Sequence, residues 1–146
     1  MIEHRALAGI ELPATSAVAQ AMEFARQKCE PYLFNHVVRS WLFAARIGQL
    51  KNLDYDAEVV AVGTLLHDIT LNSAFAGPRR FEVEGADLAR TFAESIGFDR
   101  HRAQLIWDCV ALNSTPSIGL YKEPEVALCT TCLLYTSDAA DEARSV

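Results

Sequence analysis

The sequence predicts an all-α fold of about six helices. Apolar residues recur at helical spacing along most of the chain, while sustained alternation of apolar and polar residues and hairpin dipeptides of the Asn-Gly type are missing. The length of 146 residues, with 51% hydrophobic and 22% charged residues, fits one domain with its own core.

Capping and breaking residues delimit the first three helices. The first is expected after Pro13, with Thr15 or Ser16 as N-cap, and Pro31 should end it. The second should cover about residues 34–49.

The third helix, capped by Asp54 or Asp56 and ending near residue 72, is apolar on most sides. We therefore expect it at the centre of the fold. Residues 72–80, which include Gly77-Pro78, should form a loop.

The remaining helices are expected in the second half of the chain. A fourth should run from about residue 82 to Gly97, which is a good helix terminator, and a fifth should follow the cap Asp99 to about residue 112. Residues 113–119 are expected to form a loop, and Pro124 should start the sixth helix.

Residues 132–142, CLLYTSDAADE, resemble a sequencing-library adapter translated as coding sequence. We therefore expect the native part of this sequence to stop near Thr131. Residues 1–131 would then form a domain that is truncated at its C-terminus, and residues 132–146 a non-native tail. One cysteine of the pair Cys129-Thr-Thr-Cys132 would then belong to the tail, and no second CxxC pair occurs. No zinc site is expected there.

The formal net charge of −6 argues against a general nucleic-acid or anionic-membrane binder, because those surfaces require clustered Lys and Arg. Neither an apolar run of about 20 residues nor a signal-peptide core is present. We expect a cytoplasmic protein that binds neither nucleic acid nor membranes, with its four cysteines reduced.

Two of the four histidines, His36 and His67, lie inside strongly apolar segments, and Asp68 follows the second. Burying these groups is costly unless they are hydrogen-bonded or share a cation. Imidazole and carboxylate are the usual ligands of Zn, Fe, Mn or Co. Alternatively, the histidines are core residues bonded to backbone carbonyls, and spacing alone leaves both interpretations open. His4 and His101 are expected at the surface.

Four segments carry a resemblance to a known family: FNHVVRSWLFA, LLHDIT, RRFEVEGADLARTF and WDCVALNSTPSIGLYKEPEVALCT. Together they resemble HD-domain proteins, specifically the cyanamide-hydratase-like branch, over about residues 12–130. The resemblance implies an HD-domain helical bundle that binds metal through an earlier His, the His-Asp doublet and a later Asp.

When this ligand pattern is carried over to the present sequence, the resemblance implies that His36, His67 and Asp68 bind the metal. It also implies that the doublet His67-Asp68 is catalytic. The later Asp has no match, because the adapter-like sequence begins where it would lie, and neither Asp138 nor Asp141 is assigned to it. We expect one divalent transition metal, Zn foremost with Fe, Mn or Co as alternatives, held by three of the four protein ligands.

The resemblance implies a metal-dependent hydrolase or hydratase that adds water to a small nitrile-type substrate. A cation with open positions binds water and lowers its pKa, which prepares the water to attack an electrophile. Asn113 could hydrogen-bond the substrate or simply cap its helix.

One alternative is an HD-type phosphohydrolase that acts on a nucleotide or another phosphoester. Arg79 and Arg80 could clamp the phosphate, or they could be solvated or salt-bridged. The carboxylate that often follows the doublet in that branch is replaced here by Ile69-Thr-Leu-Asn72.

A second alternative is a non-catalytic HD binding module or an inactive fragment. If helices that normally cover the bundle are missing, apolar surface should be exposed. Self-association into a homo-oligomer, or instability, would follow.

Overall fold

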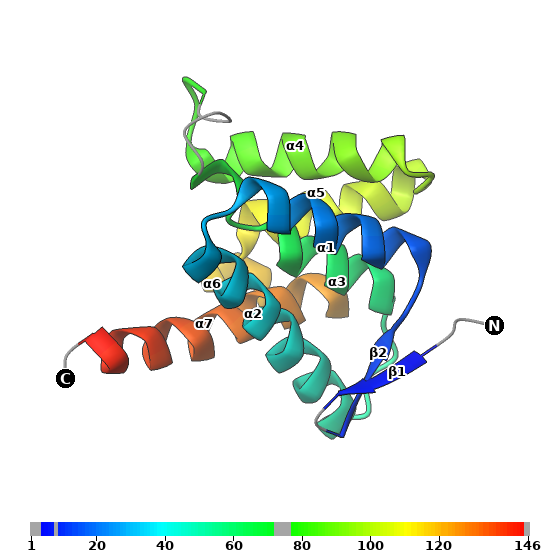
Figure 1. The fold of residues 1–146 in the computed structure, drawn as a ribbon, viewed down its shortest axis with the longest axis vertical. Helices are drawn as coiled ribbons and strands as arrows, with labels where there is room; N and C mark the ends of the chain where they lie inside the picture. Colours follow the sequence, from blue (N-terminus) through cyan, green and yellow to red (C-terminus); the bar gives the residue numbers. More distant parts are fainter. Residues whose placement is uncertain (1–3, 8, 72–76, 145–146) are drawn as a thin grey trace.

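The computed structural model describes residues 4–7, 9–71 and 77–144, and over these ranges it confirms the all-α prediction. Figure 1 shows the helices gathered around α3, with a small hairpin at the N-terminal end. The α-helices are α1 Ser16–Lys28, α2 Pro31–Leu50, α3 Ala57–Leu66, α4 Phe81–Ser95, α5 Arg100–Leu112, α6 Pro116–Gly119 and α7 Pro124–Arg144. The remaining elements are the strands β1 His4–Leu7 and β2 Ile10–Pro13 and the 3-10 helix η1 Ile69–Leu71.

Three helices begin at the polar caps that the sequence predicts. The side chains of Thr15, Asp56 and Asp99 each accept a hydrogen bond from the backbone N–H three residues later. These bonds satisfy amides that have no partner inside the helix, so the caps fix the starts of α1, α3 and α5.

Two predicted boundaries differ from the structure. Helix α2 starts at Pro31 rather than near residue 34, because proline suits the first helical turn as well as it ends the preceding helix. Helix α3 ends at Leu66 rather than near residue 72, and the chain continues through a turn into η1. Of the predicted loop, residues 72–76 lie outside the described residues, and residues 77–80 have no regular structure.

The sequence analysis missed two short elements. Strands β1 and β2 pair antiparallel with His4 opposite Pro13, although no strand was predicted. Four residues per strand are too few for sustained alternation, and the turn carries Gly9 with φ 78° rather than an Asn-Gly pair. Helix α6 is one turn inside the predicted loop 113–119, where Pro116 occupies the first turn.

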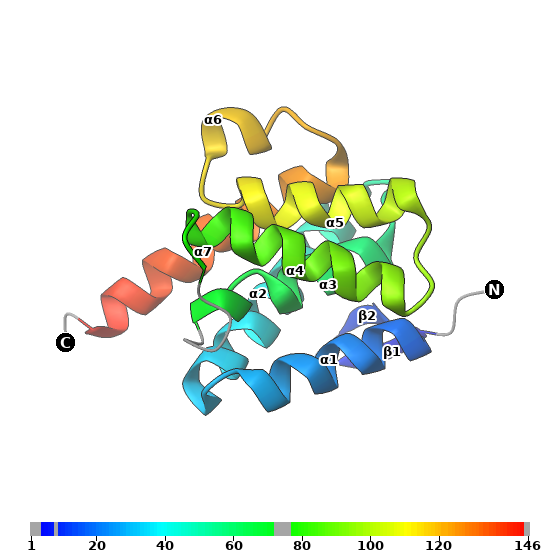
Figure 2. The ribbon, with the colours of Figure 1, turned by 90° about the horizontal axis from the view of Figure 1, so that it is seen from above.

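Helix α3 forms the centre of the bundle, as predicted. Every residue from Val59 to Leu66 is buried, and α3 packs against α1, α2, α5 and α7. Figure 2 shows α4 alongside α5, with α7 emerging from behind this pair, and α7 packs against α2 and α5. The N-terminal part of α2 lies beside the C-terminal end of α3, and this arrangement positions the site described below.

Helix α7 continues without interruption across the predicted boundary at Thr131. Cys132, the first residue of the predicted tail, is buried in a cluster with Ala44, Val60 and Leu128. All four cysteines are free thiols, as expected, and all are buried.

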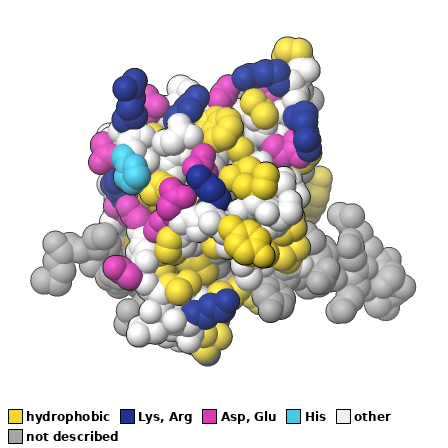
Figure 3. Space-filling view, turned by 180° about the vertical axis from the view of Figure 1, so that it is seen from behind, with side chains coloured by type: hydrophobic (Ala, Val, Ile, Leu, Met, Phe, Trp, Pro, Cys, Tyr) yellow, Lys and Arg dark blue, Asp and Glu magenta, His cyan; other side chains and the backbone are white. Residues whose placement is uncertain are grey.

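On one face of the molecule, acidic and basic side chains are interspersed, with hydrophobic side chains among them. Figure 3 shows Lys and Arg side chains beside Asp and Glu side chains on the face opposite to that of Figure 1. Among the described helices, none combines the length and the apolar character that a membrane span requires.

Candidate metal centre

Helices α2 and α3 bring His36, His67 and Asp68 together. His36 lies in the second turn of α2, His67 is the C-cap of α3, and Asp68 follows it. The Oδ2 atom of Asp68 lies 3.2 Å from Nε2 of His36 and 3.1 Å from Nε2 of His67. One ligand atom from each residue lies within 4.8 Å of the others, so the three predicted ligands form one cluster.

The backbone fixes the tautomer of His67. Its Nδ1 atom donates a hydrogen bond to the carbonyl oxygen of Thr64, at 2.6 Å. A carbonyl oxygen only accepts, so Nδ1 carries the proton and Nε2 of the neutral ring presents a lone pair. This arrangement is typical of metal-binding histidines, whose second ring nitrogen donates to a backbone carbonyl. Sequence reasoning missed Thr64, because a backbone acceptor leaves no signal in residue type.

The Nε2 atom of His67 is buried and has no hydrogen-bond partner. The Asp68 oxygen lies within ion-pair distance, but the contact is not aligned as a hydrogen bond. A lone pair and a carboxylate oxygen at this separation repel each other unless a cation, either a proton or a metal ion, lies between them.

The electrostatics of the cluster favour an anionic Asp68. Burial on its own would raise the pKa of Asp68, but His67 and His36 together hold it well below its usual range. Burial lowers the pKa of His67, and the Asp68 carboxylate and the Thr64 carbonyl outweigh this effect and raise it. The cluster thus presents one negative charge to whatever cation it holds.

One side of the cluster is open. The His67 side chain is only 4% exposed, whereas those of His36 and Asp68 are 23% and 16% exposed. Water or a small molecule can therefore approach from the side of His36 and Asp68.

The residues fit a transition-metal ion. Two imidazole nitrogens and one carboxylate oxygen are the donor set that Zn, Fe, Mn and Co prefer. The Nε2 atom of His67 is a buried ligand atom with no hydrogen-bond partner. Three protein ligands leave coordination positions open, as catalytic sites require.

An apolar cluster adjoins the site. Cys29 and Leu33 pack with Ile69, the residue that follows Asp68. Burial, reinforced by the nearby Asp68 carboxylate, raises the pKa of the Cys29 thiol. Cys29 therefore stays protonated and neutral at neutral pH.

The two loop arginines form ion pairs with helix α4. Arg79 lies 3.0 Å from Glu84 and 2.6 Å from Asp87, and Arg80 lies 3.0 Å from Glu82. The salt-bridged alternative is therefore the arrangement in the structure.

Asn113 is the C-cap of α5 and is buried. This position matches the capping alternative. His101 is exposed, as predicted. The environment of the His4 side chain lies outside the described residues.

Comparison with known proteins gives no family model that matches this chain. No curated protein matches it either. The resemblance to HD-domain proteins therefore stays a prediction from the sequence, and the geometry of the cluster stands on its own.

Proposed function

We propose that this chain is a metal-dependent hydratase or hydrolase of the HD type. It holds one divalent transition metal, Zn foremost, through Nε2 of His36, Nε2 of His67 and Oδ2 of Asp68. The observation that carries the proposal is the buried Nε2 atom of His67, which faces the Asp68 carboxylate and has no hydrogen-bond partner.

The protein groups have separable roles in this scheme. The Thr64 carbonyl keeps the proton of His67 on Nδ1, so that Nε2 is ready to bind a cation. The negative charge of Asp68 offsets part of the cation's charge. His36 and Asp68 border the open side, where water and substrate enter. A bound metal would supply a water of lowered pKa and would polarise the substrate.

The substrate that we propose is a small, neutral nitrile-type molecule, as the sequence resemblance implies. The water oxygen bonds to the nitrile carbon, and the nitrogen gains the two hydrogens, so that cyanamide would become urea. A neutral substrate needs no cationic clamp. A phosphoester does, and Arg79 and Arg80 already neutralise carboxylates of α4.

The first test is elemental analysis of the purified chain beside two variants. His67→Ala removes the buried ligand, and His101→Ala removes an exposed histidine that lies outside the cluster. We expect near-stoichiometric metal in the parent and in His101→Ala, and loss of metal in His67→Ala. Equal metal content in all three proteins, or none in any, would overturn the proposed centre.

The second test separates the reaction classes. The metal-loaded parent and His67→Ala are incubated with cyanamide, and urea is measured; the same proteins are assayed with p-nitrophenyl phosphate. Urea formation that His67→Ala abolishes supports the hydratase. Phosphoester hydrolysis alone would replace it with the phosphohydrolase alternative, and metal without either activity would favour a binding module.

A further inference from the structure

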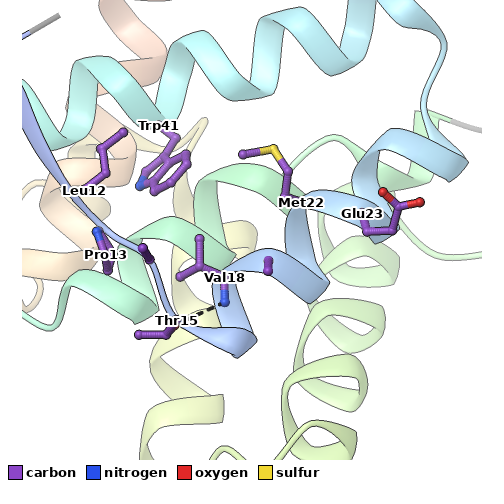
Figure 4. Close-up of a pocket in the computed structure, with 9 residues that line it drawn as sticks. Leu12, Pro13, Thr15, Val18, Met22, Glu23 and Trp41 are labelled. Atoms are coloured by element: carbon purple, nitrogen blue, oxygen red, sulfur yellow. Dashed lines mark hydrogen bonds between the residues drawn. The ribbon is translucent and has the colours of Figure 1, made fainter. Parts of the chain in front are cut away.

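A cavity lies away from the metal centre, between the N-terminal segment and helices α1 and α2. It measures about 360 Å³, within the range of small-molecule pockets. Figure 4 shows Leu12 and Pro13 on one side, Val18 and Met22 of α1 along another, and Trp41 of α2 above them. Its lining is mainly apolar.

Trp41 gives this cavity a polar feature. Its side chain belongs to the core and the residue is 5% exposed, yet its indole N–H makes no hydrogen bond within the described part of the chain. The Nε1 atom is not fully enclosed by protein, so a small molecule can reach it. Buried tryptophans usually find an acceptor for this group, because it donates and cannot accept. The other tryptophan follows the rule, since Trp107 Nε1 donates to Asp87 Oδ1 at 2.7 Å.

The rim of the cavity carries negative charge. Glu23 lines it, and hydrogen bonds from Arg26 and Gln27 hold the pKa of Glu23 below its usual range. Thr15, another lining residue, donates its hydroxyl hydrogen bond to Glu58 at 2.7 Å, so it offers no free donor. Glu23 is the one charged residue among the described lining residues, so the lining offers no cation to an anionic ligand, and Trp41 supplies the donor that a neutral acceptor needs.

We propose that this cavity binds a small neutral molecule with an apolar body of about one aromatic ring and one hydrogen-bond acceptor. The acceptor takes the hydrogen bond of Trp41 Nε1, and the body packs against Leu12, Val18 and Met22. The site is separate from the metal centre. Trp41 follows His36 by five residues on α2, which turns the two side chains roughly 140° apart around the helix axis.

Three probes of similar size test the proposal. Acetophenone has the acceptor, ethylbenzene has nearly the same shape without it, and benzoate is its anionic counterpart. The chain contains two tryptophans, so its nitrogen-15 NMR spectrum gives two indole N–H signals, and a Trp107→Phe variant assigns them. We expect acetophenone to shift the Trp41 signal in a saturable way and to leave that of Trp107 in place.

The affinities provide the quantitative test. A neutral hydrogen bond corresponds to about fivefold in affinity, so acetophenone should bind about fivefold more tightly than ethylbenzene. Trp41→Phe should abolish that difference, and benzoate should not bind measurably. A Trp41 signal that does not respond to acetophenone, or equal affinities for the two neutral probes, would overturn the proposal.

A cavity-filling variant covers the case in which Trp41→Phe fails to fold. Ala19 is exposed on α1 and lines the cavity, so Ala19→Phe should fill the space without disturbing the core. We expect both neutral probes to lose binding while the melting temperature stays the same. Unchanged acetophenone binding in Ala19→Phe would place the probe elsewhere and refute the assignment.

Discussion

At the scale of single residues, His67 illustrates how a polar group acquires a function from its surroundings. The end of α3 places its Nδ1 against the Thr64 carbonyl and leaves Nε2 in a buried space beside Asp68. A histidine satisfied at both nitrogens would be structural. Here only one nitrogen is satisfied, and the other faces a negative charge.

The charge of Asp68 should matter more than its shape. Asp68→Asn keeps the size of the side chain but removes the negative charge that faces both imidazoles. We expect zinc affinity, measured by competition with a chromogenic chelator, to fall at least about tenfold, because the neutral amide is a poorer ligand. Asp54→Asn, at an exposed position outside the cluster, should leave the affinity unchanged. Equal affinities for both variants would exclude Asp68 as a ligand.

At the scale of elements, Arg102 ties helix α5 to the start of α3. Its guanidinium hydrogen-bonds both oxygens of Asp56, at 2.8 and 3.1 Å, and Glu58 at 2.9 Å. The backbone N–H of Asp56 donates to Glu125 of α7. These partly buried contacts join three helices at one end of the bundle.

This network predicts a specific pH dependence of stability. Burial on its own raises the pKa of Asp56, but the hydrogen bonds from Arg102 and from the Val59 amide outweigh it and lower the pKa. The resulting stabilisation is present above the unfolded pKa of about 3.9 and is lost as the pH falls through the lower folded value. Arg102→Met should cost about 1–2 kcal/mol of unfolding free energy at neutral pH.

The difference between the parent and Arg102→Met should shrink in acid, as measured by urea denaturation at several pH values. Arg26→Met is the control, because Arg26 pairs with Glu23 on the exposed face of α1 and should contribute little. A difference that stays constant down to the acid limit would show that Arg102 acts through packing rather than through its charge.

Helix packing depends on one glycine of α3. A methyl group at Gly63 would meet the Cβ atom of Cys109 at 2.8 Å, whereas one at Gly85 would meet Thr70 and Val110 at 3.3 Å. Both are helical positions, where alanine is otherwise favoured by about 0.5–1 kcal/mol. Overpacking costs about 1–3 kcal/mol, so Gly63→Ala should be destabilising and Gly85→Ala close to neutral in thermal unfolding. The reverse order would contradict the packing described for α3 and α5.

At the scale of the whole molecule, local signals in the sequence predicted most of the fold. Thr15, Asp56 and Asp99 act as caps through their own neighbouring amides, so sequence alone could place the helix starts. The hairpin and α6 were missed because four residues are too few to establish a period. The partners of Arg79 and Arg80 remained open because solvent and carboxylate are equally compatible with a loop arginine.

The candidate site was predictable in its residues but not in its geometry. Apolar surroundings marked His36 and His67 as costly to bury, and the doublet placed Asp68 beside them. Whether the three side chains converge depends on how α2 crosses α3, which is a matter of tertiary packing. The Thr64 carbonyl holds the Nδ1 atom of His67 and leaves Nε2 without a hydrogen bond. A backbone carbonyl is present at every residue, so the sequence could not predict this contact.

Because the cluster links α2 to the end of α3, metal binding should stabilise the whole bundle. A ligand that binds only the folded state contributes about 2.7 kcal/mol at a concentration one hundred times its Kd. For a chain of this size, saturating Zn²⁺ should raise the melting temperature by about 5–10 °C, and a chelator should reverse the shift. His67→Ala should melt at one temperature with or without Zn²⁺, whereas His101→Ala should respond like the parent. A zinc-induced rise that persists in His67→Ala would mean that the ion binds elsewhere and that His36, His67 and Asp68 are structural.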